Sequence, residues 1–137
     1  MTGRASRNKG ARAELELVHM FRDHLGITCN RNYKQVAQAQ HGDIEQLIGP
    51  YLIESKNCKD LELAKWWEQA RVAAEAHPNK PMPCVAYRLP NRKPEDRWRF
   101  TVPIPQAWTS GHAWGRGLSY TQTLHRDGFF LLVREQA

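Results

Sequence analysis

The stretch HGDIEQLIGPYLIESK, residues 41–56, decides the predicted fold. It contains two apolar runs separated by Gly49 and Pro50, and a glycine–proline pair in this position is typical of a tight turn. We therefore predict two short strands that form a hairpin, in which Ile48 faces Tyr51 across the turn.

Four charged side chains fall on this predicted hairpin. In its register Glu45 lies opposite Glu54, and Asp43 lies opposite Lys56. Side chains alternate between the two faces of a strand, so Leu52, Glu54 and Lys56 share one face. Three carboxylates and one ammonium group on an otherwise apolar hairpin are costly to bury unless a cation or a substrate uses them. The hairpin therefore indicates a metal site.

Length and composition limit the class of protein. The chain has 137 residues, of which 41% are hydrophobic and 25% charged, as is typical of one folded domain with a modest core. The net charge of +6 indicates a polyanionic partner, nucleic acid first and an anionic membrane second. The longest apolar run, Phe129 to Val133, is too short to span a bilayer, and no apolar segment follows the basic N-terminus as in a secretory signal. The three widely separated cysteines favour neither disulfides nor a zinc site and fit a reducing cytoplasm.

The N-terminal residues are basic. We predict a mobile arm at residues 1–10 that becomes helical near Gly10 or Ala11 and contacts phosphate groups; the charge pattern by itself is equally compatible with a solvated tail. The basic residues of this region, which has no acidic residue before the predicted helix, are Arg4, Arg7, Lys9 and Arg12.

A helix is predicted from Ala11 to Leu25, because apolar residues recur there at helical spacing and Gly26 ends the pattern. Glu14 lies four residues before Val18 and therefore extends the apolar stripe of this helix. A carboxylate on a buried stripe needs a partner. One alternative is an ion pair with a lysine or arginine at the end of the stripe, which is the better interpretation of Glu14 taken alone. The other is a role in the metal site.

Periodicity and turn residues define the remaining elements. They are a strand at 27–33, a loop at 34–40, the hairpin, a helix that Asp60 caps and that ends near Ala76, strands at 82–88 and 97–102, an irregular tryptophan-rich segment at 103–125, and a closing helix that Asp127 caps. A strand is the alternative for the closing element, and the irregular segment could be an aromatic stacking surface or a dimer contact. The order predicts a single α/β domain with a core at 11–102, in which helices flank one mixed sheet.

The acidic hairpin fits phosphodiester hydrolysis. This reaction needs an attacking water, charge relief on the phosphate and help for the leaving alkoxide, and a divalent metal supplies the first two. Asp43 and Glu54 are the predicted ligands, with the backbone carbonyl of Ser55 as a third oxygen ligand, a set that suits Mg²⁺. Lys56 can orient or deprotonate the attacking water. Glu14 could hold an outer water or a second cation.

Two further polar residues have less specific predictions. Glu45 is either an alternative ligand or an exposed acid, because the hairpin register is itself an assumption. Gln69, on the predicted second helix, could point back toward the hairpin and support the site, although a surface glutamine is the default interpretation.

Three motifs resemble one known group of enzymes. They are Asn8–Glu14 at the start of the first helix, Gly42-Asp43-Ile44, and Ile53-Glu54-Ser55-Lys56. With these motifs the chain resembles the PD-(D/E)xK nuclease superfamily, and more narrowly the Holliday junction resolvases of archaea and their phage-encoded relatives. The similarity continues through the segments Trp66–Ala70 and Pro83–Tyr87 and covers roughly residues 7–102.

The resemblance implies a restriction-endonuclease-like αβββαβ core, cleavage of DNA, and dependence on Mg²⁺, for which Mn²⁺ can substitute. It places Glu14, Asp43, Glu54 and Lys56 in the active site. Resolvases of this type are homodimers that act on four-way junctions. A symmetric dimer is therefore implied, with the basic arm and the 34–40 loop, represented by Lys34 and Gln35, on DNA.

Two departures from the resolvase pattern bear on specificity. Gly42 stands where the superfamily commonly has proline, and the segment after Val102 has no evident counterpart, which affects substrate choice and dimer geometry more than chemistry. We expect a Mg²⁺-dependent, structure-selective DNA endonuclease of a phage or prophage, active in the host cytoplasm. The alternatives are a nuclease for linear, nicked or foreign DNA, and a basic DNA-binding module that keeps the fold without turnover.

Overall fold

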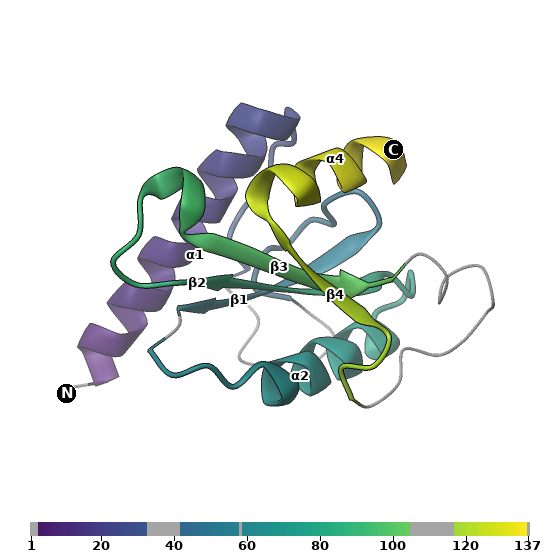
Figure 1. The fold of residues 1–137 in the computed structure, drawn as a ribbon, viewed down its shortest axis with the longest axis horizontal. Helices are drawn as coiled ribbons and strands as arrows, with labels where there is room; N and C mark the ends of the chain where they lie inside the picture. The colour runs from purple at the N-terminus through teal and green to yellow at the C-terminus, as the bar shows by residue number, and fades with distance from the viewer. Residues whose placement is uncertain (1–2, 33–41, 58, 105–116, 137) are drawn as a thin grey trace.

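The computed structural model describes residues 3–32, 42–57, 59–104 and 117–136, with side chains from Gly10 onward. It is an α/β fold in which one sheet lies between two helical layers (Figure 1). The elements are α1 (Gly3–Leu25), β1 (Tyr51–Asn57), α2 (Leu63–Ala76), β2 (Met82–Arg88), the short 3₁₀ helix η1 (Pro94–Asp96), β3 (Trp98–Pro103), β4 (Thr121–His125) and α4 (Arg126–Gln136).

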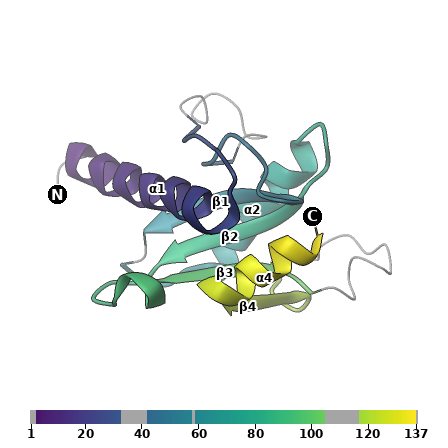
Figure 2. The same cartoon turned by 90° about the horizontal axis from the view of Figure 1, so that it is seen from above.

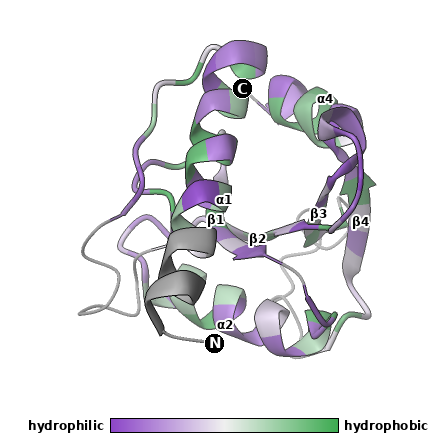
Figure 3. Cartoon of the chain, turned by 90° about the vertical axis from the view of Figure 1, so that its left-hand side faces the viewer, coloured by the Kyte–Doolittle hydropathy of each residue, from purple (hydrophilic) through white to green (hydrophobic). Residues whose placement is uncertain are grey.

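The four-stranded sheet is mixed and has the order β1-β2-β3-β4. β1 and β2 are parallel, which requires a crossover connection, and α2 provides it. The pairs β2–β3 and β3–β4 are antiparallel. α1 and α4 cover one face of the sheet and α2 covers the other (Figure 3), while the view from above places α1 and α4 in front of the strands (Figure 2). The predicted fold class, a mixed sheet flanked by helices, is confirmed.

The alternation of side chains along β1 divides the core in two. Tyr51 and Ile53 belong to the large cluster beneath α1 and α4, whereas Leu52 packs against Ala73 and Ala74 of α2. By the same alternation the next two even-numbered side chains of β1 face the α2 side. The hydrophobic pattern of β1 therefore fixes the face on which its charged residues lie.

Phe129 of α4 lies at the centre of the larger cluster. Its ring is fully buried and stacks on Phe100 of β3, with 4.3 Å between ring centroids. Tilted contacts reach Tyr51 at 5.5 Å and Phe21 at 6.4 Å, so this one side chain joins α4 to α1, β1 and β3. The closing helix is thus part of the core.

We expect Phe129→Ala to lower the free energy of unfolding by about 3–5 kcal/mol, because it removes a buried aromatic ring and leaves a cavity. Urea unfolding followed by circular dichroism would measure the change. Leu131→Ala on the same helix is the control, since Leu131 is 56% exposed and its truncation should change stability by about 0.5 kcal/mol or less. Equal effects of the two substitutions would contradict the central position of Phe129.

The N-terminal segment differs from the prediction. α1 begins at Gly3, so the residues expected to form a mobile arm up to residue 10 are the first turns of the helix. Gly10 lies inside the helix and does not start it. A glycine in a helix interior costs only about 1 kcal/mol relative to alanine, which is too little to end a helix whose other residues are mostly good helix formers.

The region before β1 also differs from the prediction. Ile48 and Tyr51 do face each other, joined by backbone hydrogen bonds of 2.9 and 3.0 Å, but residues 42–47 form no strand. The amide of Glu45 donates to Asn30 instead of pairing with β1. The strand expected at 27–33 is reduced, over its described part, to a single bridge between Arg31 and Ile44. Three strands before α2 were predicted, and one is present among the described residues.

The second half of the chain corrects two further expectations. Glu62, not Asp60, stands at the N-cap of α2, and it makes no side-chain capping hydrogen bond. Residues 121–125, expected to be irregular, form β4 because they pair with β3. The closing element is a helix, as predicted, with Asp127 inside its first turn. The predicted 34–40 loop and residues 105–116, with Trp108 and Trp114, lie outside the described residues.

Within the described ranges, no helix combines the length and the apolar character that a membrane span requires.

Candidate active site

Two hydrogen bonds fasten Asp43 to the edge of β1. Its amide donates to the carbonyl of Ile53 (2.9 Å), and its carboxylate oxygen Oδ2 accepts from the amide of Ser55 (2.6 Å). Asp43 therefore lies beside Ile53 and Ser55 and not opposite Lys56, as the hairpin register predicted. The reason is the bend at 44–47, which takes up the residues that a regular hairpin would have paired.

Gly42 makes this attachment possible. A Cβ atom at Gly42 would lie 2.6 Å from the carbonyl oxygen of Ile53, the same oxygen that accepts from Asp43. The buried side chain of Asn32 holds the other side by donating to the carbonyl of Gly42 (3.0 Å). The residue before the aspartate must therefore be small for the chain to approach β1 this closely, which gives a physical reason for glycine at this position.

We expect Gly42→Ala to displace Asp43 from β1 and to lower the free energy of unfolding by about 1–3 kcal/mol, the usual cost of forcing atoms into a packed site. Gly10→Ala is the control. Its added methyl group would meet nothing within 4 Å, and in a helix interior it should raise stability by about 0.5–1 kcal/mol. Chemical denaturation of the two variants would show whether their free energies of unfolding change in opposite directions. A neutral or stabilising Gly42→Ala would show that the close approach is not a constraint.

Glu54, which is partly buried, and Asp43, which is buried, form a carboxyl pair. Burial, the negative charge of Asp43 and a hydrogen bond between the two side chains together raise the pKa of Glu54 to about 8, against the opposing effect of Lys56. Burial likewise raises the pKa of Asp43, opposed first by the hydrogen bond from Ser55. Both carboxyl groups hold protons more tightly than usual, first because burial disfavours their charged forms and, in Glu54, also because the charge of Asp43 is close.

This pair predicts how stability depends on pH in the absence of metal. The folded pKa of Glu54 lies above its ordinary value of 4.5, so the folded chain binds a proton more tightly than the unfolded chain. Its contribution to the free energy of unfolding is therefore present below about pH 4.5 and is lost as the pH rises toward 8.

In Glu54→Gln the side chain is neutral at every pH, so stability should fall less as the pH rises. The variant should be more stable than wild type at pH 8 by on the order of 1–3 kcal/mol. Urea unfolding in EDTA at pH 5 and pH 8 would measure both effects. Glu45→Gln removes an exposed carboxylate and should leave the profile unchanged. A wild-type profile that rises between the two pH values would contradict the assignment.

Glu14 lies next to the carboxyl pair, held by an arginine. Its Oε2 accepts from Nε of Arg31 at 2.7 Å, and only 8% of the residue is exposed. Burial raises the pKa of Glu14, and the charge of Asp43 adds to the rise. The charge of Glu14 also reaches Glu54, so the three acids form one electrostatic group. Glu14 therefore forms an ion pair with an arginine, but one outside α1 and not at the end of its stripe, and it lies beside the predicted metal ligands.

Arg31 was not among the residues predicted from the sequence. It also lowers the pKa of Asp43, so it acts as a counter-ion to two acids of the group. The available signal was an arginine between two asparagines at the end of an apolar segment, Asn30-Arg31-Asn32. Pairing this basic residue with the acid on the apolar stripe would have required knowing that residues 27–32 return alongside α1.

The other predicted residues are less close to this group. Glu45 is exposed, which fits the interpretation of a bystander acid, and Gln69 is exposed on α2. Arg12 is an exposed residue of α1; Arg4, Arg7 and Lys9 belong to the same helix, but only their backbone is described. Lys34 and Gln35 lie outside the described residues.

The carboxyl pair fits a hard divalent cation. Among the described residues no group of three or more histidine, cysteine, aspartate or glutamate side chains is close enough to hold a metal ion. Mg²⁺ needs only one or two carboxylates, because it keeps several of its waters. Asp43 and Glu54 supply that number, and their raised pKa values reflect a cost of burying negative charge that a bound cation would offset.

Comparison with known protein families identifies the group. A family model described as "phage putative PDDEXK endonuclease" matches residues 5–112. The chain belongs to this family. The matched range contains Glu14, Asp43, Glu54 and Lys56, and the predicted membership in the PD-(D/E)xK superfamily is confirmed. Comparison with curated proteins and with solved structures gives no significant match. A PDDEXK endonuclease implies DNA as the class of substrate.

Proposed function

We propose that this PDDEXK endonuclease cuts branched DNA, four-way junctions above all, in a reaction that depends on Mg²⁺. The observation that supports the catalytic part is the convergence of Asp43, Glu54 and Lys56 at one edge of β1, with Glu14 beside them. The support for junctions is the resemblance of the motifs around these residues to those of Holliday junction resolvases.

Asp43 and Glu54 would hold the metal ion. The amide of Ser55 points toward Asp43, and the N–H and C=O groups of one residue point to the same edge of a strand, so the Ser55 carbonyl is the natural third ligand. When bound, Mg²⁺ lowers the pKa of a coordinated water and offsets charge on the phosphate, and Mn²⁺ can substitute for it.

Residues of the chain itself supply positioning and proton handling. Lys56 lies on the same strand face as Glu54, where its Nζ atom can orient the attacking water and donate to a phosphate oxygen. Arg31 fixes Glu14 by the 2.7 Å ion pair, which keeps this carboxylate beside the site and available to accept a hydrogen bond from an outer water. Burial of the group excludes bulk water and strengthens each of these electrostatic interactions.

A symmetric homodimer completes the proposal, because a junction is resolved by one cut in each of two strands. The described residues of one chain carry one such catalytic group. The net charge of +6 is suited to holding the arms of a junction. Sedimentation of the free protein and of its junction complex would give the number of chains in each.

The function is tested by incubating the protein with a labelled four-way junction and with linear duplex of the same sequence, in Mg²⁺ and in EDTA. We expect paired symmetric nicks in the junction, in Mg²⁺ alone. Glu54→Gln and Lys56→Ala should lower the rate by about 100-fold or more, because each removes a group that acts on the reacting atoms. Lys80→Gln, an exposed lysine that precedes β2, is the control and should cut normally.

Two outcomes would replace the proposal. Equal cutting of linear and branched DNA would identify a nuclease for linear, nicked or foreign DNA. If a folded wild-type protein binds DNA but cuts none, the chain is a non-catalytic DNA-binding module.

A further inference from the structure

The turn between β2 and β3 carries a dense group of basic residues. We call residues 88–99 the basic hairpin. It retains a net positive charge even when the acidic residues Glu16, Glu95 and Asp96 are counted with it. Its basic residues are Arg88, Arg92, Lys93, Arg97 and Arg99.

The basic hairpin lies at the end of the sheet that carries Lys56. In the strand register Lys56 pairs with Tyr87, Tyr87 pairs with Arg99, and Arg99 pairs with His125. Residues paired in this way lie on one face of a sheet, and neighbouring strands are about 4.8 Å apart. Arg99 therefore lies about 10 Å from the backbone of Lys56, on the same face, and the tip of the basic hairpin extends beyond it.

Glu16 fixes the base of the basic hairpin to α1. Its carboxylate accepts from Arg88 at 3.2 Å, from Arg97 at 3.4 Å and from Nε1 of Trp98 at 2.9 Å. Glu16 is two residues from Glu14, so the same turn of α1 holds both the acidic group and the basic hairpin. Arg88 and Arg97 are thereby occupied within the protein.

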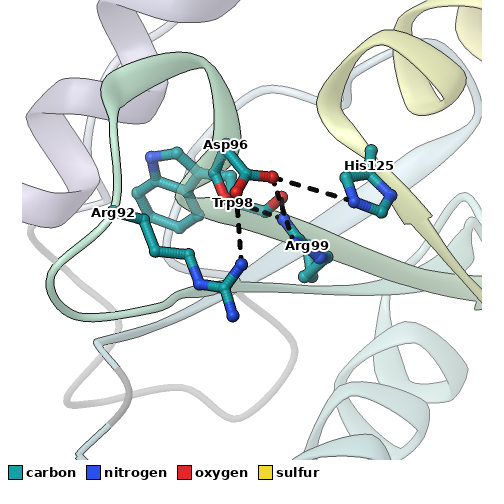
Figure 4. A network of polar contacts seen from close by, with 5 residues as sticks. All are labelled: Arg92, Asp96, Trp98, Arg99 and His125. Atoms are coloured by element: carbon teal, nitrogen blue, oxygen red, sulfur yellow. Dashed lines mark hydrogen bonds and ion pairs between the residues drawn. The ribbon is translucent and has the colours of Figure 1, made fainter.

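Asp96 holds together the outer part of the basic hairpin. Its carboxylate contacts Arg92 and Arg99 at 3.2 Å each and His125 at 3.8 Å, as Figure 4 shows. The hydrogen bond from Arg92 and the neighbouring charge of Arg99 lower the pKa of Asp96, so this carboxylate is ionised at neutral pH. One carboxylate thus aligns two guanidinium groups and leaves positive charge uncompensated.

The tip of the basic hairpin presents a net positive charge to solvent. Arg92 and Lys93 are both exposed, and no acidic side chain of the described residues forms an ion pair with Lys93. Paired charges on a protein surface ordinarily face solvent and bind no partner. An excess of cations on a hairpin at the end of the sheet that carries Lys56 is the arrangement that a polyanion requires.

We propose that the basic hairpin binds the phosphate backbone of duplex DNA beside the cutting site, through Arg92 and Lys93. The inference rests on the proposed function, because Lys56 marks the scissile phosphate only if the chain is a nuclease. Along each DNA strand one phosphate occurs per roughly 3.4 Å of helix axis, so a contact 10 Å or more away reaches a phosphate about three nucleotides from the cut. The DNA arm would then run from β1 across the ends of β2 and β3.

The test is the salt dependence of DNA binding. Fluorescence anisotropy of a labelled four-way junction and of a labelled linear duplex, in EDTA so that no strand is cut, would be measured from 50 to 300 mM salt. Each phosphate contact contributes about 0.9 to the slope of log affinity against log salt. The double variant Arg92→Gln with Lys93→Gln should therefore reduce the slope by about 2 and bind roughly 10- to 100-fold more weakly at 0.1 M salt.

A charge-matched control lies at the opposite end of the sheet. Lys80 precedes β2 and Arg134 contacts the end of α1, so Lys80→Gln with Arg134→Gln removes the same charge far from Lys56. This control should keep the wild-type slope, because charges more than about 10 Å away are screened at 0.1 M salt. Thermal unfolding of both double variants would show that they fold.

Equal slopes for the two double variants would overturn the inference, as would a wild-type protein that binds no DNA. Failure of the proposed function gives a different result: the wild type would bind DNA with the steeper slope yet cut nothing when Mg²⁺ is added.

Discussion

The attachment of Asp43 to the edge of β1 is the constraint on which the site depends. One hydrogen bond joins the backbones, and a second joins the Asp43 carboxylate to the amide of Ser55. Together they bring a carboxylate carried by an irregular segment to the side of Glu54. The attachment requires a small residue before Asp43, because the carbonyl of Ile53 occupies the space that a Cβ at Gly42 would need.

The energetic consequence is that the acidic group costs folding stability while its negative charge is only partly compensated. Burial raises the pKa of Asp43, Glu54 and Glu14, and the charge of Asp43 adds to the rise in both glutamates. Arg31 and Lys56 offset only part of these effects. A folded chain keeps such an arrangement when a ligand uses it. Under the proposed function, this arrangement would serve a hard cation at some cost to the stability of the chain, a common relation between function and stability in active sites.

α1 links the acidic site to the basic surface. Its buried stripe packs on the sheet through Leu17 and Phe21, while Glu14 and Glu16 leave the stripe in different directions. Glu14 reaches Arg31 and the site, and Glu16 reaches the base of the basic hairpin. The distance between the site and the basic surface is thus set by one turn of a rigid helix and by the register of the sheet.

The sequence by itself determined the class of fold, the elements with strong periodicity and the identity of the acidic group. Regular patterns such as those of α2, β2 and β3 depend on local spacing, and the motif around Glu54 and Lys56 sits on a strand whose apolar residues set its face. The tertiary structure decided which residues meet. The partner of Glu14 is Arg31, the bend at 44–47 replaces a regular hairpin, and β4 forms only because β3 offers it an edge. These features arise from contacts between segments distant in the chain, and a local sequence pattern does not predict such contacts.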